Sequence, residues 1–203
     1  MNCEYYFGLL DLKGASLKKY FYPEDLPSDW CISYYCNEFE LLIIHCSDLL
    51  LSTQADAVSA EDIIDQLSEI TDDIDESTVL LFDCADLSDA VQQQLYCYQT
   101  AIEGLSGFIN TAQVDNSTII SQDIQLEWGR VVNDVVKNGR ENNSALFCHV
   151  KSTKTIKPVE LKQLLETMDD YAQGKEAAII NVIFSSEHAL ENCRNALLLE
   201  SMM

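Results

Sequence analysis

The chain has 203 residues, of which 47% are hydrophobic, and it carries a net charge of −22. Its size and apolar content predict one folded domain over residues 1–203, while the absence of an apolar run near about 18 residues and of a visible signal sequence predicts a cytoplasmic protein without a transmembrane helix. The charge repels phosphate backbones and anionic lipid, which disfavours binding to nucleic acid or to a membrane surface.

The chain begins with a strand and a rigid turn. Glu4–Leu12 has the composition of a strand. Pro23 and Pro27 fix their own φ angles and disfavour helix in the residue before each of them, so they predict an extended turn. Ser28 or Asp29 then caps a short helix, because a short side-chain oxygen can accept hydrogen bonds from first-turn amides.

The short helix leads into a buried strand. Trp30, Tyr34 and Phe39 are spaced to lie roughly on one face of the helix. Leu41–Ile44 is apolar on both faces, which is typical of a strand covered by helices on both sides. The strand ends in polar residues, His-Cys-Ser-Asp at 45–48.

These residues resemble a known family. The segments FYPEDLP, SDW, CISYY, CNEFE and LLIIH, over residues 21–45, are similar to the opening of the YecE-like family, whose function is unknown and whose fold is TIM-barrel-like. With Tyr6–Leu9 (YFGL) as the first strand, the resemblance covers about the first 46 residues. The family's second strand ends in Asn-x-Thr-Phe-Tyr, whereas this chain has His-Cys-Ser-Asp, which implies a divergent or site-depleted relative. Residues 146–156 (LFCHVKSTKTI) are similar to another family strand that ends in a lysine, here Lys151.

Helices and strands alternate in the rest of the chain. Ser59 begins a helix as a capping box in which Asp62 stands in place of the usual Glu or Gln. The later elements are expected at Thr78–Phe82 (strand), Ala90–Leu105 (helix), Phe108–Thr111 (strand), Ser121–Asn138 (helix), Ala145–Lys151 (strand), Pro158–Gly174 (helix), Ala177–Phe184 (strand) and from Ser185 or Ser186 to the terminus (helix).

The helix expected at Ser121–Asn138 rests on apolar residues at helical spacing. They are Ile124, Trp128, Val131, Val132 and Val135, with Gly139 as the cap. Glu127 and Arg130 would then form a pair on the surface of this helix.

Six strand–helix units predict an α/β protein with a mostly parallel sheet and right-handed crossovers. A complete eight-unit barrel usually needs about 250 residues, so the chain is short for one. With the resemblance, the first expectation is an abbreviated or distorted TIM-barrel-like fold. The alternative is an open doubly wound parallel sheet.

In either architecture, ligands bind at the carboxyl ends of the strands. Imidazole and carboxylate groups there suit either a metal site or an acid–base pair, and the candidate catalytic residues are His45, Asp83 and His149. The candidate ligand-binding residues are Asp11, Asp48, Asp86, Lys151 and Lys154. Ser185, Ser186 and His188 also follow a strand. The alternative is that His45 and His149 only end buried strands, with hydrogen-bonded rings.

Lys151 and Lys154 belong to the one local basic cluster, Lys-Ser-Thr-Lys-Thr-Ile-Lys-Pro at 151–158. It precedes a helix N-terminus, which attracts a phosphate or carboxylate. The alternative is a solvated loop that offsets the acidic charge.

The sequence contains no metal-binding motif, and no metal ligands are assigned. The eight cysteines include no C-x-x-C pair, so the sequence predicts free thiols in a reducing cytosol and no structural zinc site. Asp72–Glu76 lacks the central glycine of a calcium loop. No cofactor is indicated.

The charge leads to the first functional hypothesis. Residues 20–129 contain 22 Asp or Glu and no Lys or Arg. We expect a binding or interaction protein whose acidic block docks a basic protein partner, or which forms a homo-oligomer through another face. The alternative is an enzyme or a binder of a small phosphate or carboxylate at the strand ends. Mimicry of nucleic acid by the acidic block is a third hypothesis, and solubility alone would also explain the charge.

Overall fold

Residues 3–10, 12, 15–49, 59–98, 102–132 and 145–202 are described by a computed structural model. Their strands are β1 (Glu4–Leu9), β2 (Leu41–His45), β3 (Val79–Asp83), β4 (Leu105–Ile109), β5 (Asn116–Ser121), β6 (Ile124–Arg130), β7 (Ala145–Ser152) and β8 (Ile179–Ser185). Their helices are α1 (Ala15–Tyr20), α2 (Cys31–Cys36), α3 (Ala60–Asp72), α4 (Asp89–Tyr98), α5 (Pro158–Lys175) and α6 (Ala189–Glu200). Within these ranges, no helix combines the length and the apolar composition needed to span a bilayer.

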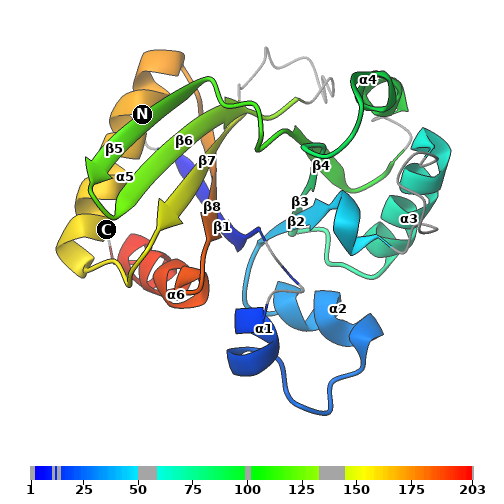
Figure 1. The fold of residues 1–203 in the computed structure, drawn as a ribbon, viewed down its shortest axis with the longest axis horizontal. Helices are drawn as coiled ribbons and strands as arrows, with labels where there is room; N and C mark the ends of the chain where they lie inside the picture. The colour runs from blue at the N-terminus through cyan, green and yellow to red at the C-terminus, as the bar shows by residue number, and fades with distance from the viewer. Residues whose placement is uncertain are drawn as a thin grey trace.

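The strands form two sheets (Figure 1). One has the order β1-β8-β7-β6-β5, in which β1, β8 and β7 are parallel and the β5–β6 hairpin is antiparallel. The other is the parallel sheet β2-β3-β4. The α/β class is therefore confirmed, and the described strands form no closed barrel.

Both sheets contribute apolar side chains to a shared inner cluster. Leu41, Ile43 and Leu81 of the three-stranded sheet pack there with Phe147 and Ile183 of the other sheet. Because side chains alternate along a strand, the residues between them face outward into a larger core beneath the helices. The continuous apolar runs in the sequence reflect this burial on both faces.

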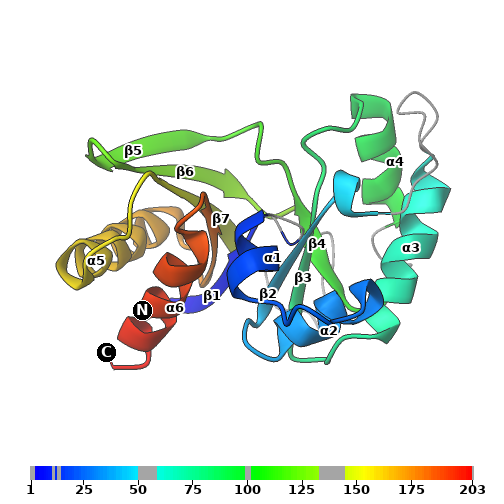
Figure 2. The same cartoon turned by 60° about the horizontal axis from the view of Figure 1, so that its bottom comes forward.

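The helices cover the outer faces of the sheets. In Figure 2, α5 and α6 lie against the five-stranded sheet, and α3 and α4 lie beside the three-stranded one. α3 begins as expected: Ser59 Oγ accepts a hydrogen bond from the Asp62 amide, and an Asp62 carboxylate oxygen accepts one from the Ser59 amide. Ile63 and Leu67 fix the orientation of α3, because they are fully buried on one of its faces.

A tyrosine joins the two sheets where β1 meets β2. The buried Tyr35 hydroxyl accepts a hydrogen bond from the Leu9 amide of β1 at 2.8 Å and donates one to the Leu41 carbonyl of β2 at 3.1 Å. Gly8 lies at the same junction of β1 and β2, which we call the Tyr35 seam. A β-carbon at this position would come within 2.3 Å of the Leu41 carbonyl oxygen. On the other side, an isolated antiparallel bridge pairs Phe108 of β4 with Val132.

The prediction of a helix at Ser121–Asn138 was wrong, because this segment continues the β5–β6 hairpin. Residues 133–138 lie outside the described part of the chain. Ile124, Leu126 and Trp128 are buried at alternate positions, which is the period of a strand. Pairing with β7 completes the backbone hydrogen bonds of β6. The Trp128 ring stacks on the Tyr171 ring, with 4.1 Å between the ring centroids. Tertiary pairing thus decided the structure of this segment.

The ends of other predicted helices and strands, and the burial of some aromatic residues, differ from the prediction. The helix expected to reach Leu105 ends at Tyr98, and the strand expected at Phe108–Thr111 is β4, which begins at Leu105. Gly104 precedes it with a φ of 88°, a conformation that favours glycine. On α2 the deeply buried aromatic ring is Tyr35, whereas Trp30 and Tyr34 are exposed. The helix α1 was not expected from the sequence.

The Tyr35→Phe substitution tests the seam. It would leave the Leu9 amide and the Leu41 carbonyl buried without this partner, so we expect the free energy of unfolding to fall by about 2–4 kcal/mol in urea denaturation. Tyr34→Phe is the matched control on the same helix, because Tyr34 is 37% exposed; it should change stability by under about 0.5 kcal/mol. Equal effects of the two substitutions would contradict the role assigned to the Tyr35 hydroxyl.

Candidate functional site

Polar side chains follow the apolar inner cluster at the strand ends. Asp83, His149 and Ser185 each lie two residues beyond a member of that cluster, namely Leu81, Phe147 and Ile183, and so face the same side of their strands. His45 extends β2 in the same way and is directly opposite Asp83 in the strand register. We refer to His45, Asp83, Glu127, His149, Lys151 and Ser185 as the carboxyl-edge cluster.

A hydrogen bond joins His149 to Ser185. The ring Nε2 of His149 lies 2.6 Å from the Ser185 Oγ. The parallel register of β7 and β8 produces this contact, because it pairs His149 with Ile183 and so places Ser185 two residues further on the same face. The His149 side chain is only 6% exposed, whereas Ser185 is partly accessible.

Glu127 stands on the other side of the His149 ring. Its Oε2 lies 3.8 Å from His149 Nδ1, and within the described residues Nδ1 makes no hydrogen bond. Lys151 Nζ lies 2.7 Å from the same carboxylate oxygen. A neutral imidazole with its proton on Nδ1 leaves Nε2 able to accept from the Ser185 hydroxyl and turns the Nδ1–H toward the Glu127 carboxylate.

The environment of His149 favours the neutral ring. Burial lowers the pKa of His149 to about 4, and the nearby Lys151 charge acts in the same direction. The Glu127 and Asp83 carboxylates oppose this shift, but they do not overcome it. His149 is therefore an uncharged proton acceptor at neutral pH.

Asp83 is held by neutral donors. Its fully buried carboxylate accepts hydrogen bonds from the Thr111 hydroxyl at 2.5 Å and from the Thr111 and Ala85 amides at 3.1 Å each. These bonds tie the residues after β3 to those after β4. The geometry thus holds the Asp83 carboxylate in a fixed orientation at the end of β3.

His45 belongs to a local group at the end of β2. Its Nε2 lies 3.3 Å from the Asp86 carboxylate, and its amide donates to an Asp48 oxygen at 3.1 Å. The structure therefore brings together three of the expected site residues around His45, and it brings Lys151 to the Glu127 carboxylate beside His149. The fourth acidic candidate, Asp11, lies outside the described residues.

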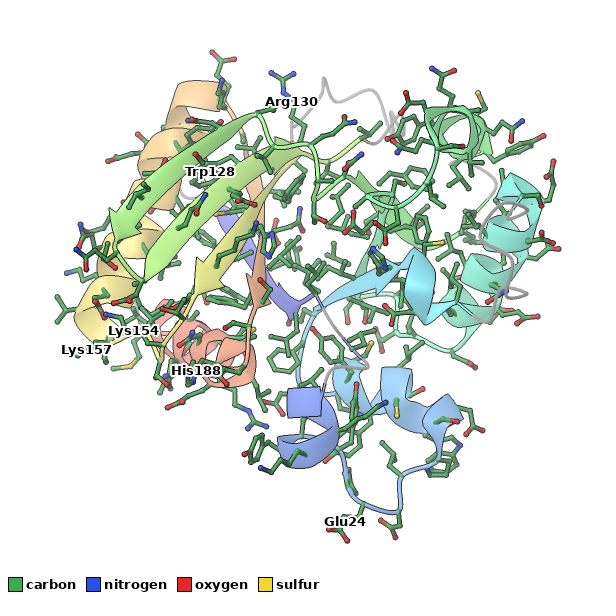
Figure 3. All side chains as sticks on the ribbon, in the orientation of Figure 1. Glu24, Trp128, Arg130, Lys154, Lys157 and His188 are labelled. Carbon is green, nitrogen blue, oxygen red and sulfur yellow. The ribbon has the colours of Figure 1, made fainter. Side chains whose placement is uncertain are left out.

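Lys154 is separated from the carboxyl-edge cluster. Figure 3 shows Lys154 and Lys157 near the start of α5. Lys154 Nζ lies 3.0 Å from Glu160 and 3.3 Å from Asp123. A Glu160 oxygen also accepts from the Lys157 amide at 3.0 Å, so a carboxylate of the chain itself occupies the position expected for an anion.

Sequence analysis missed Glu127 and Ser185 as partners of His149. Glu127 was assigned to the surface of a helix, whereas on β6 its side chain is only 12% exposed and faces His149. The alternation of Ile124, Leu126 and Trp128 was the signal that would have placed Glu127 on a strand. Ser185 was noted at a strand end, but only the register connects it to His149.

The described residues contain no group of three or more His, Cys, Asp or Glu side chains able to hold a metal ion. In the acidic segment Asp72–Glu76, the Asp75 carboxylate accepts a hydrogen bond from the Ser77 amide. The eight cysteines are free thiols, and burial raises the pKa of Cys84 to about 12.

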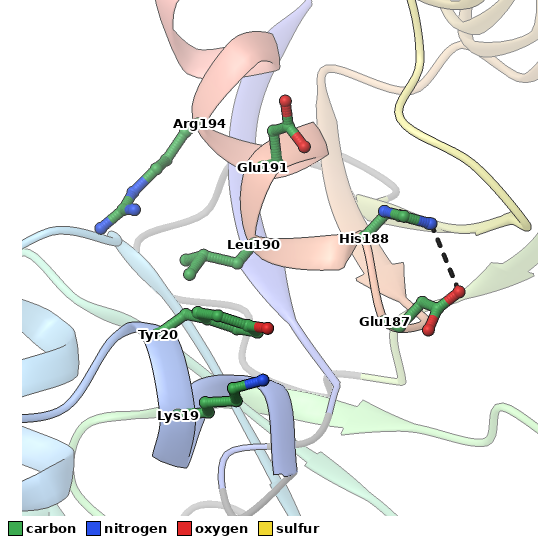
Figure 4. Close-up of a pocket in the computed structure, with 7 residues that line it drawn as sticks. All are labelled: Lys19, Tyr20, Glu187, His188, Leu190, Glu191 and Arg194. Atoms are coloured by element: carbon green, nitrogen blue, oxygen red, sulfur yellow. Dashed lines mark ion pairs between the residues drawn. The ribbon is translucent and has the colours of Figure 1, made fainter.

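A cavity of about 580 Å³ lies between α1 and the start of α6 (Figure 4). Its charged groups already have partners. Arg194 forms a two-pronged pair with Glu38 at 2.5 and 3.0 Å, and Glu191 accepts a hydrogen bond from the Thr155 hydroxyl at 2.7 Å. His188 lies 3.4 Å from Glu187. These internal pairs make the cavity a weaker candidate than the carboxyl-edge cluster.

No family model, curated protein or solved structure matches the chain. Its function is therefore inferred from its own residues. The chemically distinctive arrangement among them is Ser185–His149–Glu127, with a hydroxyl, a neutral imidazole and a carboxylate in sequence.

The lowered pKa of His149 predicts a pH-dependent stability. Between about pH 6.5 and pH 4 the unfolded chain binds a proton at this residue that the folded chain does not, so acidification destabilises the fold. Urea denaturation should show that wild type loses about 2 kcal/mol more than His149→Gln between pH 7 and pH 5. Equal losses in wild type and His149→Gln would refute the buried neutral imidazole.

Proposed function

We propose that the chain is an enzyme that acts on a small acyl substrate through Ser185, with His149 as the proton acceptor. The supporting observation is the 2.6 Å contact between His149 Nε2 and Ser185 Oγ at the carboxyl end of parallel strands. Ligands of α/β proteins bind at such ends. The partial exposure of Ser185 beside a nearly buried imidazole suits a hydroxyl that reacts with a molecule from solvent.

The chemistry follows from these two groups. Ser185 Oγ forms a bond to the carbonyl carbon of an ester or thioester, while its proton moves to His149 Nε2. The carbon–leaving-group bond then breaks, and the imidazolium returns the proton to the departing oxygen or sulfur. Water attacks the acyl-serine with the same proton transfers, which releases a carboxylic acid and restores the Ser185 hydroxyl.

Glu127 and Lys151 would position the ring. A carboxylate near Nδ1 favours the tautomer that leaves Nε2 free to accept, and it stabilises the imidazolium during the reaction. The Lys151 ammonium at 2.7 Å fixes the Glu127 carboxylate and reduces its effect on the ring. Consistent with the low pKa of His149, the rate should rise with pH near pH 4 and then stay constant to neutral pH.

We further propose that the fold is an abbreviated, open relative of the TIM-barrel-like YecE family. The shared inner cluster, the Tyr35 seam and the Phe108–Val132 bridge support this proposal, because each links the two sheets as a barrel wall would. The free cysteines suit a reducing compartment, and we propose the cytoplasm as the location.

Reaction with a fluorophosphonate tests the nucleophile. The reagent phosphonylates an activated serine with loss of fluoride, so intact mass spectrometry should show one adduct on wild type. Ser185→Ala should show none, and His149→Gln should react at least about 100-fold more slowly, since a general base contributes about 10²–10⁴ in rate. Ser186→Ala is the matched control, because the neighbouring hydroxyl is exposed but has no imidazole partner among its hydrogen bonds in the described residues. The absence of an adduct, or its persistence in Ser185→Ala, would rule out the proposal.

The acidic block supports a second candidate function, docking of a basic protein. The exposed face of α3 carries Glu61, Asp65, Glu69 and Asp72 within a stretch that has no Lys or Arg. Neutralising these four residues should weaken binding of a decalysine peptide at low salt by at least about ten-fold in titration calorimetry. Neutralising Asp170, Glu187, Glu191 and Glu200 changes the net charge equally and is the control. Equal weakening by both sets would indicate a general charge effect without a docking face.

A further inference from the structure

A second cavity of about 380 Å³ lies between the α1–α2 segment and α3. Its apolar walls are Leu12, Tyr22, Ile32, Ile44, Leu49 and Ile70. The volume is at the lower end of the roughly 300–1,000 Å³ of ligand sites, and apolar walls with a few polar groups are their usual lining. The cavity therefore suits a small organic molecule with an apolar body.

This cavity is separate from the carboxyl-edge cluster. Ile44 contributes its wall from the outer face of β2, whereas Ile43 and His45 face the inner side. Neither Ser185 nor His149 is among its lining residues. An inference about its ligand does not depend on the proposed acyl chemistry.

The charged groups at the cavity determine the kind of ligand. Among the described residues that line it, Asp29, Asp48 and Glu69 are accompanied by one cation, Lys18, so these four groups carry a net charge of about −2 at neutral pH. The surrounding sequence from residue 20 to residue 129 adds no Lys or Arg. A carboxylate or phosphate ligand would be repelled, whereas an ammonium would be attracted. A bare metal ion does not fit this site, since the described residues offer no group of three ligating side chains.

We propose that the cavity binds a small primary ammonium ion attached to an aryl or alkyl body. The body would pack between Ile32, Ile44 and Ile70, while the ammonium would lie at the carboxylates of Asp29 and Glu69. The Tyr22 ring on the wall also favours a cation, because an aromatic face attracts positive charge. Gln66 and Ser28 supply neutral hydrogen-bonding groups at the same cavity.

Titration calorimetry with three probes of matched shape tests the proposal. They are 2-phenylethylamine, 2-phenylethanol and 3-phenylpropionate. We expect the amine to bind at least about ten-fold more tightly than the alcohol, since a single charge pair near the surface contributes about that much, and the acid to bind least. Equal affinity for amine and alcohol, or no binding of any probe, would overturn the proposal.

Substitutions on α3 test which carboxylate attracts the ammonium group. Glu69→Gln should weaken binding of 2-phenylethylamine by about three- to ten-fold. Glu61→Gln is the matched control, because Glu61 is exposed on the same helix and is not among the lining residues of the cavity. Both substitutions are on the surface and should leave thermal unfolding unchanged. Equal weakening by the two variants would mean that the general negative field, and not the cavity, attracts the amine.

A substitution that fills the cavity tests the location of the ligand independently. Ile32→Trp adds volume at a partly exposed position and should reduce amine binding at least ten-fold. Circular dichroism and thermal unfolding report whether this variant is folded, and neither readout depends on the proposed reaction of Ser185. Undiminished amine binding in a folded Ile32→Trp protein would place the ligand elsewhere and refute the assignment.

Discussion

The arrangement of the molecule depends on the hydrogen bonds of one tyrosine. β1 and β2 belong to different sheets, and the Tyr35 hydroxyl links their backbones through the Leu9 amide and the Leu41 carbonyl. Gly8 allows the two strands to approach closely at this point. A buried amide or carbonyl without a partner is costly, so the short helix that carries Tyr35 is needed to hold the sheets together.

The joined sheets explain why polar residues meet at the strand ends. Side chains that face the shared inner cluster are apolar along most of each strand and become polar at its carboxyl end, as with Phe147 and then His149. Burial keeps the His149 ring neutral while Ser185 and Glu127 lie on its two sides. The proposed acyl chemistry is thus a consequence of strand register and burial in a chain without a familiar catalytic motif.

The charge distribution separates two kinds of surface. Lys151 and Lys154 belong to the five-stranded sheet and the loop after it, where carboxylates already balance them. The stretch around α2, α3 and α4 contains no basic residue of its own, and a cation that pairs with it, such as Arg194 with Glu38, comes from elsewhere in the chain. The proposed ammonium site and the proposed docking face for a basic partner both use carboxylates of that stretch.

The sequence by itself determined the α/β class, the two-faced strands, the start of α3 at Ser59 and the presence of His45, Asp83 and His149 at strand ends. These features follow from local capping and from the period of apolar residues, which a chain carries in any context. Tertiary structure alone decided that residues 116–130 form a β-hairpin, that the strands divide into two sheets, and that Ser185 and Glu127 flank His149. The reason is physical: the segment of Glu127 fits both a helical and a strand period, and pairing with β7 selected the strand, while the contact of His149 with a serine 36 residues away is set by the β7–β8 register and not by any local preference.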